Sequence, residues 1–455
     1  MGTPPARSWI VRGLVVAAAL AVTVAVVRRN GPSSDSSSIA ASHDARVLRG
    51  RPKTARELPT TSADIYLGNL DEEIGELLRL TRERPDLLTN LTTLSAAHHT
   101  RGRLRDDPDE IQLGIDEATR CIALAKDPPD TPAGARQDAK CYLMRAEQEQ
   151  SLHRFKESRA DLKRARDAFS DPARGADLET ELDWNDGRYE ASIPKLREAR
   201  RLRPSTSTWI REAQLEHDLG REDEADAAFE AAEDLILDTN PLIVAHLNVQ
   251  RGIQKVATGK LDLAIEFFRE AVSRVPTHVA AAEHLAETLG MQGRHDAAAA
   301  RYEKVVAMSD DPEFSHALAV EYALIGGREK EIAALEAKAR EGYERLVAKY
   351  PEAMYWHASE YYLATNDSPR ALALLEKNVA LRPGSPSFVA LARAQLANGR
   401  VADAKASIDK ALAMPLVSAD LFMTASRVYA KSGDAKAALA YRARALRINP
   451  RVEGD

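Results

Sequence analysis

Carboxylate and guanidinium side chains recur at one position of a repeating pattern, and ion pairing is the chemistry that they could support. The position lies six residues before each of a series of turn markers, and later in the chain it holds Glu287, Glu321, Glu360, Arg393 and Arg427. Three acidic positions followed by two basic ones predict a charged stripe that binds a partner, with Phe314 and Trp356 nearby as anchoring contacts. The alternative is a solvated helix surface whose charges only maintain solubility.

Motifs for catalysis or metal binding do not stand out. The segment from Gly252 to Lys260 lacks the spacing of a phosphate-binding loop, and Leu261 stands where such a loop needs a hydroxyl. The eleven histidines are scattered, and His98 and His99 are adjacent, so they point to different sides of a helix. We therefore predict a protein that is not an enzyme, with no catalytic residue, cofactor, metal site or small-molecule substrate.

Only two cysteines are present, Cys121 and Cys141, and they form no C-x-x-C pair. They are expected on packed neighbouring helices, so a disulfide is geometrically possible. The interpretation we favour is two unlinked, buried thiols. Export of the domain to an oxidising compartment would favour the bridge instead.

Two series of markers share a period of about 34 residues, which is the signature of stacked helical hairpins. Glycine permits the left-handed backbone of a tight turn between helices, and proline interrupts helical hydrogen bonding. The turn markers are Gly187, Gly220, Gly259, Gly293, Gly327, Asn366, Gly399 and Gly433. The second series is Pro172, Pro204, Pro241, Pro276, Pro312, Pro351, Pro383, Pro415 and Pro450.

Small and bulky residues alternate between the markers as two crossing helices require. In the last unit Phe422, Ala425 and Tyr429 precede the turn at Gly433, and the second helix ends at Pro450. The layout resembles the tetratricopeptide repeat (TPR) family, well from 139 to 450 and in degenerate form from 64 to 138. The resemblance implies an all-α, right-handed superhelical solenoid of about ten hairpins, whose concave groove binds extended or helical segments of other proteins.

One unit departs from the period. Gly327 and Pro351 are 24 positions apart, seven more than the 17 of a typical marker pair such as Gly259 and Pro276. Seven residues are about two helical turns, so the inner face keeps its phase while the second helix of that unit becomes longer.

Composition agrees with a repeat protein, because aromatic residues are only 5% of the chain and no composition break follows residue 64. Lys and Arg total 63 against 69 Asp and Glu, a balance that does not favour nucleic acid as a partner. Residues 1–60 carry nine basic and three acidic side chains, so the basic charge is concentrated in the N-terminal tail.

The N-terminal residues predict attachment to a membrane. After a short tail (1–8), residues 9–27 are long and apolar enough to form a transmembrane helix. A cleaved signal sequence is the alternative, but Arg28 and Arg29 directly after the candidate cleavage site favour an anchor. Residues 28–63 are basic and rich in serine, which predicts a disordered tether. Residues 451–455 form a short C-terminal tail.

Together these patterns predict a membrane-anchored TPR scaffold for protein–protein interactions in a bacterial cell envelope. The alternative is a structural or regulatory subunit of an envelope enzyme or export complex. A short N-terminus followed by a long soluble domain favours an extracytoplasmic position, whereas the basic flank from Arg28 to Arg56 favours the cytoplasm. Oligomerisation is open: we favour a last repeat that caps itself, and the alternative is that it stacks on another protein or on a second copy of this chain.

Overall fold

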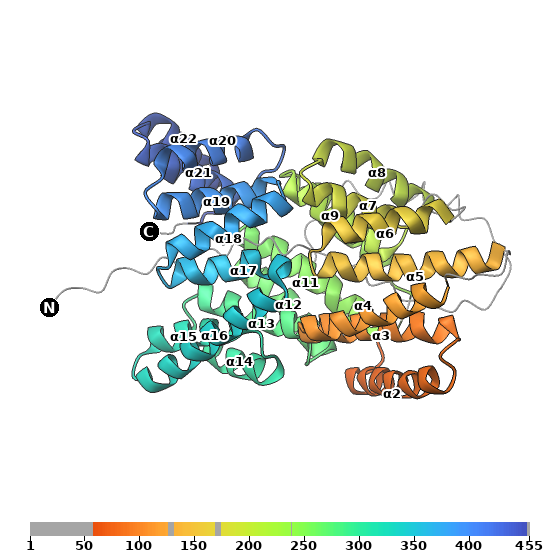
Figure 1. Cartoon of the computed structure of the whole chain (residues 1–455). Coiled ribbons are helices and arrows are strands. Elements are labelled where there is room, and N and C mark those ends of the chain that lie inside the picture. The colour runs from red at the N-terminus through yellow and green to blue at the C-terminus, as the bar shows by residue number, and fades with distance from the viewer. Residues whose placement is uncertain (1–57, 126–131, 169–173, 238, 453–455) are drawn as a thin grey trace.

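The computed structural model describes residues 58–125, 132–168, 174–237 and 239–452, and regular structure within these ranges is entirely helical. Helix α2 (Ala63–Glu83) comes first, and the helices α3 to α22 pair in order into ten hairpins (Figure 1). This confirms the predicted all-α solenoid.

The first helices of the hairpins are α3 (Leu88–Arg105), α5 (Pro132–Ser151), α7 (Ala176–Asn185), α9 (Thr206–Asp218), α11 (Pro241–Ala257), α13 (Val279–Met291), α15 (Pro312–Ile325), α17 (Pro351–Ala364), α19 (Ser385–Ala397) and α21 (Ala419–Lys431). The second helices are α4 (Pro108–Leu124), α6 (Phe155–Ala168), α8 (Tyr189–Leu202), α10 (Glu222–Asp234), α12 (Leu261–Arg274), α14 (His295–Met308), α16 (Glu329–Lys349), α18 (Ser368–Leu381), α20 (Val401–Leu412) and α22 (Ala435–Ile448).

The turn markers act as predicted. Gly220 and the other marker glycines have positive φ, and Asn366 takes the same left-handed conformation. His153, one repeat length before Gly187, also has a positive φ of 57°, so the series extends one unit further than its glycines. The prolines differ from expectation, because Pro312 and Pro351 begin helices rather than end them. Proline suits this first position, where its missing N–H leaves no bond unmade.

Helices cross closely where a small residue faces a bulky one. A Cβ atom on Gly252 of α11 would lie 2.4 Å from the ring of Phe268 on α12, so only glycine fits there. Ala264 and Leu285 belong to the same buried cluster, which spans α11 to α13. Each hairpin therefore buries its apolar residues against its neighbours, as a solenoid requires.

Helix α16 accounts for the unit with the longer marker spacing. It has 21 residues, against 14 in α14. Its buried residues, Ala339, Gly342, Tyr343 and Leu346, all lie in its second half. The seven additional residues therefore lengthen the second helix of that unit, as predicted.

The hairpins wind into a superhelix whose successive turns contact each other. In Figure 1 the chain climbs from α2 to α8 on one side, crosses through α9 to α13, and climbs again from α14 to α22 on the other side. We call the line of contacts between the two turns the seam. It joins Asp109 to Tyr350, His153 to Glu352, Tyr189 to Ser385, Asp218 to Val417, and Val256 to Asn449.

Several seam contacts are buried and specific. The Tyr350 hydroxyl donates to the Asp109 carboxylate at 2.5 Å, and Ile111 and Ile115 pack with Leu346 and Tyr350 beside it. Further along, the Tyr189 hydroxyl accepts a hydrogen bond of 2.9 Å from the Ser385 amide. The solenoid is therefore a closed coil rather than an open curved rod.

Cys121 and Cys141 form a disulfide, which corrects the expectation of two free thiols. Cys121 lies at the end of α4 and Cys141 within α5, and the two Cα atoms are 5.8 Å apart. Both residues are fully buried beside Leu91 of α3. The two neighbouring helices therefore bring the cysteines within bonding range. The sequence analysis had expected the cysteines on such helices.

The predicted anchor at 9–27 lies outside the described residues, and so does most of the predicted tether. Among the residues that the structure does describe, no helix combines the length and apolar character needed to cross a membrane. The last residues of the predicted tether, 58–63, are packed on the repeats: the Thr61 amide donates to the Thr239 carbonyl at 2.7 Å, and Arg274 donates to the Leu58 carbonyl.

Candidate partner-binding site in the lumen

The turn between α3 and α4 reaches the inside of the superhelix, a space that we call the lumen. Leu104 packs into the buried cluster of α11 to α13. Asp106, at the C-terminal end of α3, has a positive φ of 53° and lies within electrostatic reach of His284, Glu313 and His357. Its side chain is accessible to water, yet burial raises its pKa. Asp106 therefore lines an enclosed, solvent-accessible space.

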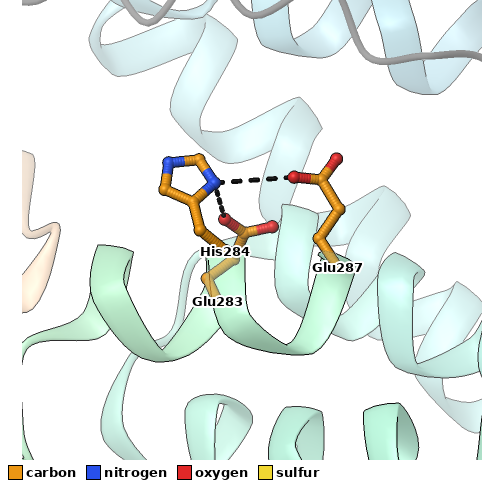
Figure 2. Close-up of side chains that lie close together, drawn as sticks. All are labelled: Glu283, His284 and Glu287. Atoms are coloured by element: carbon orange, nitrogen blue, oxygen red, sulfur yellow. Dashed lines mark ion pairs between the residues drawn. The ribbon is translucent and has the colours of Figure 1, made fainter. Parts of the chain in front are cut away.

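One wall of the lumen carries a histidine between two carboxylates on helix α13 (Figure 2). His284 Nδ1 lies 2.9 Å from Glu283 Oε2 and 3.5 Å from Glu287 Oε2. Burial alone would lower the pKa of His284, but the charges and hydrogen bonds of the two carboxylates raise it to about 10. At neutral pH, His284 is therefore an imidazolium that holds both carboxylates.

The same three side chains are the one group among the described residues whose donor atoms could hold a metal ion together. Their ligand atoms all lie within 4.8 Å of one another. A cation bound there would displace the proton of His284, because the imidazole nitrogen must be neutral to act as a ligand. The ion-paired imidazolium already satisfies both carboxylates, so a metal is not required to explain the group.

A second charged group lies nearby, at the start of the neighbouring first helix α15. His357 Nδ1 is 3.0 Å from Glu313 Oε2, and Asp311 caps the helix by accepting the Glu313 amide at 2.7 Å. Burial, together with the charges of Asp106 and Glu313, raises the pKa of Asp311 to about 8. This part of the lumen is therefore crowded with acidic groups.

In the other part of the lumen, a series of hydrogen bonds connects the first helices of four neighbouring hairpins. We call this series the ladder. Gln150 Nε2 of α5 and Arg211 Nη2 of α9 donate to the two oxygens of Glu181 on α7, at 2.6 and 2.5 Å. Arg211 Nη1 also donates to Gln214, and Gln214 Nε2 donates to Gln250 on α11 at 2.5 Å. Burial raises the pKa of Glu181 to about 7. Polar residues therefore connect the concave faces of neighbouring repeats.

The predicted stripe lies on the first helices, as the repeat pattern indicated, but its charges are largely paired. Glu321 is buried and lies 2.9 Å from His295 Nδ1. Glu360 accepts a 2.6 Å bond from Arg393 of the next first helix. Glu287 faces His284, and Arg427 is half-buried on α21. Glu321 and Glu360 thus make contacts between repeats, whereas Glu287 pairs within α13, and the role of the stripe in partner binding stays a prediction.

The two aromatic anchors predicted beside the stripe are buried, which corrects that expectation. Phe314 packs with Val279 and Val305 between α13, α14 and α15. Trp356 packs with Leu375 and Ala390 between α17, α18 and α19. Each ring has only a few per cent of its surface exposed, because bulky residues on these helices fill the space between repeats.

Comparison with known families agrees with the fold. Two family models, both described as tetratricopeptide repeat, match residues 255–320 and 389–452. Residues 255–320 and 389–452 therefore contain tetratricopeptide repeats, a family whose members generally act as non-catalytic scaffolds that bind other proteins. Among curated proteins, none matches the sequence.

Solved structures with a similar arrangement are distant in sequence. A human IFIT1 dimer with PPP-AAAA is 18% identical with a TM-score of 0.41, over 91% of this chain and 95% of that one. Yeast Tom70 is 12% identical with a TM-score of 0.38, over 84% and 87%. The Cut9–Hcn1 hetero-tetramer of the APC/C is 12% identical with a TM-score of 0.36, over 85% and 92%.

Sequence reasoning missed the residues that meet in the lumen. Asp106 and Arg103 come from the degenerate first hairpin, whereas Asp311 and His357 come from repeats more than 200 positions later. The repeat period describes contacts between neighbours and contains no signal for this meeting. The adjacent pair Glu283 and His284, followed by Glu287, was the available sign of a histidine held by carboxylates.

Proposed function

We propose that this protein is a non-enzymatic scaffold for protein–protein interactions in a bacterial cell envelope. The observation that supports it most is the unbroken array of ten hairpins, two stretches of which match tetratricopeptide repeats. Such an array offers a continuous surface rather than a reactive centre. We propose the polar lumen, lined by the ladder and the acidic group, as the surface that binds partner segments.

We further propose that residues 9–27 anchor the chain in the cell membrane and that the repeats are extracytoplasmic. The disulfide between Cys121 and Cys141 supports this side, because such bonds persist in oxidising compartments. The charge of the residues that flank the proposed anchor is compatible with either side of the membrane. The disulfide is therefore the observation that favours export.

The alternative proposal is a structural or regulatory subunit of an envelope enzyme or export complex. Photo-crosslinking in intact cells, followed by purification in detergent and identification of partners, distinguishes the two. Several substoichiometric partners support the scaffold, and one enzyme or export component at fixed stoichiometry supports the subunit. Recovery of the protein without any crosslinked protein would contradict both.

A matched pair of variants locates the binding surface. Glu287→Lys changes a lumen carboxylate, whereas Glu344→Lys changes a carboxylate on the exposed side of α16. We expect the first to reduce partner crosslinking about ten-fold and the second to leave it unchanged. Equal crosslinking by both variants would remove the lumen from the proposal and leave the scaffold role standing.

A further inference from the structure

Arg103 is a cation inside the lumen that has no direct partner among the described residues. It lies in the last turn of α3 and is half-buried. No described residue forms an ion pair or hydrogen bond with it, although Glu181 and Asp106 act on it from further away. Burial lowers the pKa of its guanidinium to about 9. An arginine that is partly withdrawn from water is commonly paired with a carboxylate through its fork of donors, and Arg103 has no such pair among the described residues.

Two further buried groups near Arg103 have atoms without a hydrogen-bond partner. His246 and Gln250 lie one helical turn apart on α11 and are 6% and 3% exposed. The His246 Nδ1 and Gln250 Nε2 atoms have no hydrogen-bond partner in the part of the chain that the structure describes. Because buried polar atoms are nearly always satisfied in native proteins, such a pair indicates a missing ligand.

The three groups lie in one region. Leu104, next to Arg103, packs in the same cluster as Ala245 and Val249, which are next to His246 and Gln250 on α11. The charges of Arg103 and Arg211 both contribute to lowering the pKa of His246. Arg211 is paired with Glu181, so Arg103 is the guanidinium of this region that has no direct partner among the described residues.

We propose that this part of the lumen is a binding site for an oxyanion, formed by Arg103, Arg211, His246 and Gln250. A carboxylate or phosphate group would accept from the Arg103 fork, from Gln250 Nε2 and from the protonated nitrogen of His246. One ligand would then explain both unsatisfied atoms and the guanidinium of Arg103 that lacks a direct partner among the described residues. The site does not depend on the scaffold role, because a free anion can bind it with no partner present.

The site differs from the predicted stripe in position and in charge. The stripe begins on α13 with carboxylates, whereas the oxyanion site uses α3, α9 and α11. An anion here would lie beside the acidic group around Asp106 and Asp311 without replacing any of its contacts. The lumen thus has a basic part and an acidic part.

The test is calorimetric titration of the full-length protein in detergent with two probes, inorganic phosphate and a short glutamate-rich peptide, at constant ionic strength. A glutamine-rich peptide is the neutral control. We expect one bound anion per chain. Binding of phosphate supports a free anion as the ligand, and binding of only the acidic peptide supports a carboxylate carried by a partner.

Three variants make the assignment specific. Arg103→Gln should weaken binding about 10- to 100-fold, since it removes the charged donor. Gln250→Glu supplies a carboxylate from the protein itself, so it should abolish binding and raise the midpoint of thermal unfolding. Arg105→Gln, on the exposed side of the same helix, should bind as the wild type does. Binding of neither probe, or equal binding by wild type and Arg103→Gln, would overturn the proposal.

Discussion

The backbone amide of Val417 donates a hydrogen bond of 2.8 Å to the carbonyl oxygen of Asp218. The two residues belong to different turns of the superhelix, and Gly220 lies directly against the Val417 side chain. A backbone bond between hairpins so far apart in the sequence shows that the turns fit each other closely.

Glycines at the seam should tolerate substitution less well than those elsewhere. Gly187 and Gly399 have nearly equal positive φ values, 73° and 71°. A Cβ on Gly187 would lie 2.8 Å from the Pro383 carbonyl oxygen, whereas one on Gly399 meets nothing within 4 Å. We expect Gly399→Ala to lower the free energy of unfolding by about 1 kcal/mol and Gly187→Ala by about 2–4 kcal/mol. Urea denaturation measures both, and equal losses would argue against the seam.

The hydroxyl of Tyr189 should contribute to stability through the seam. It is buried and accepts a hydrogen bond from the Ser385 amide, so Tyr189→Phe leaves that amide without a partner. The expected loss in the free energy of unfolding is about 1–3 kcal/mol. Tyr355→Phe is the control, since its half-buried ring stands near Lys377, and we expect a change below about 0.5 kcal/mol. A loss no larger than that of the control would contradict the contact.

Reduction of the disulfide should destabilise the first repeats. The bond closes a loop with a sequence separation of 20, for which the loss of chain entropy corresponds to about 3 kcal/mol. We expect a reductant to lower the urea midpoint of the wild type and not that of the double variant Cys121→Ser, Cys141→Ser. Alkylation without reductant should label no cysteine, and labelling of both in protein isolated from cells would contradict the bridge and the proposed export.

Stability should depend on pH through His284. Its pKa is about 10 in the folded protein and 6.5 ordinarily, so its ion pairs stabilise fully below pH 6.5. Their contribution declines as pH rises from 6.5 to 10 and is absent above that. We expect His284→Gln to cost about 3 kcal/mol at pH 6 and progressively less towards pH 10. Urea denaturation at several pH values measures this difference, and a constant difference would show that His284 does not hold a proton there.

The sequence predicted the features of the fold that depend on contacts between neighbouring repeats. The markers from Gly187 onwards located the hairpins, and the spacing between Gly327 and Pro351 predicted the longer α16. The repeat pattern did not predict the seam or the approach of Asp106 to Asp311 and His357, because these depend on how twist accumulates over many repeats. The burial of Phe314 and Trp356 was missed for a related reason, since a first helix presents one side to the lumen and another to the next repeat.

The closed coil changes how the array should respond to stress. A chain of repeats that touch only their nearest neighbours frays from its ends, and each unit melts nearly by itself. Here the terminal hairpin is fastened to the middle of the chain by Asn449 and Val256, and the first hairpin by Asp109 and Tyr350. Through each of these contacts the interior repeats stabilise an end of the coil, so the coil should unfold as one cooperative unit.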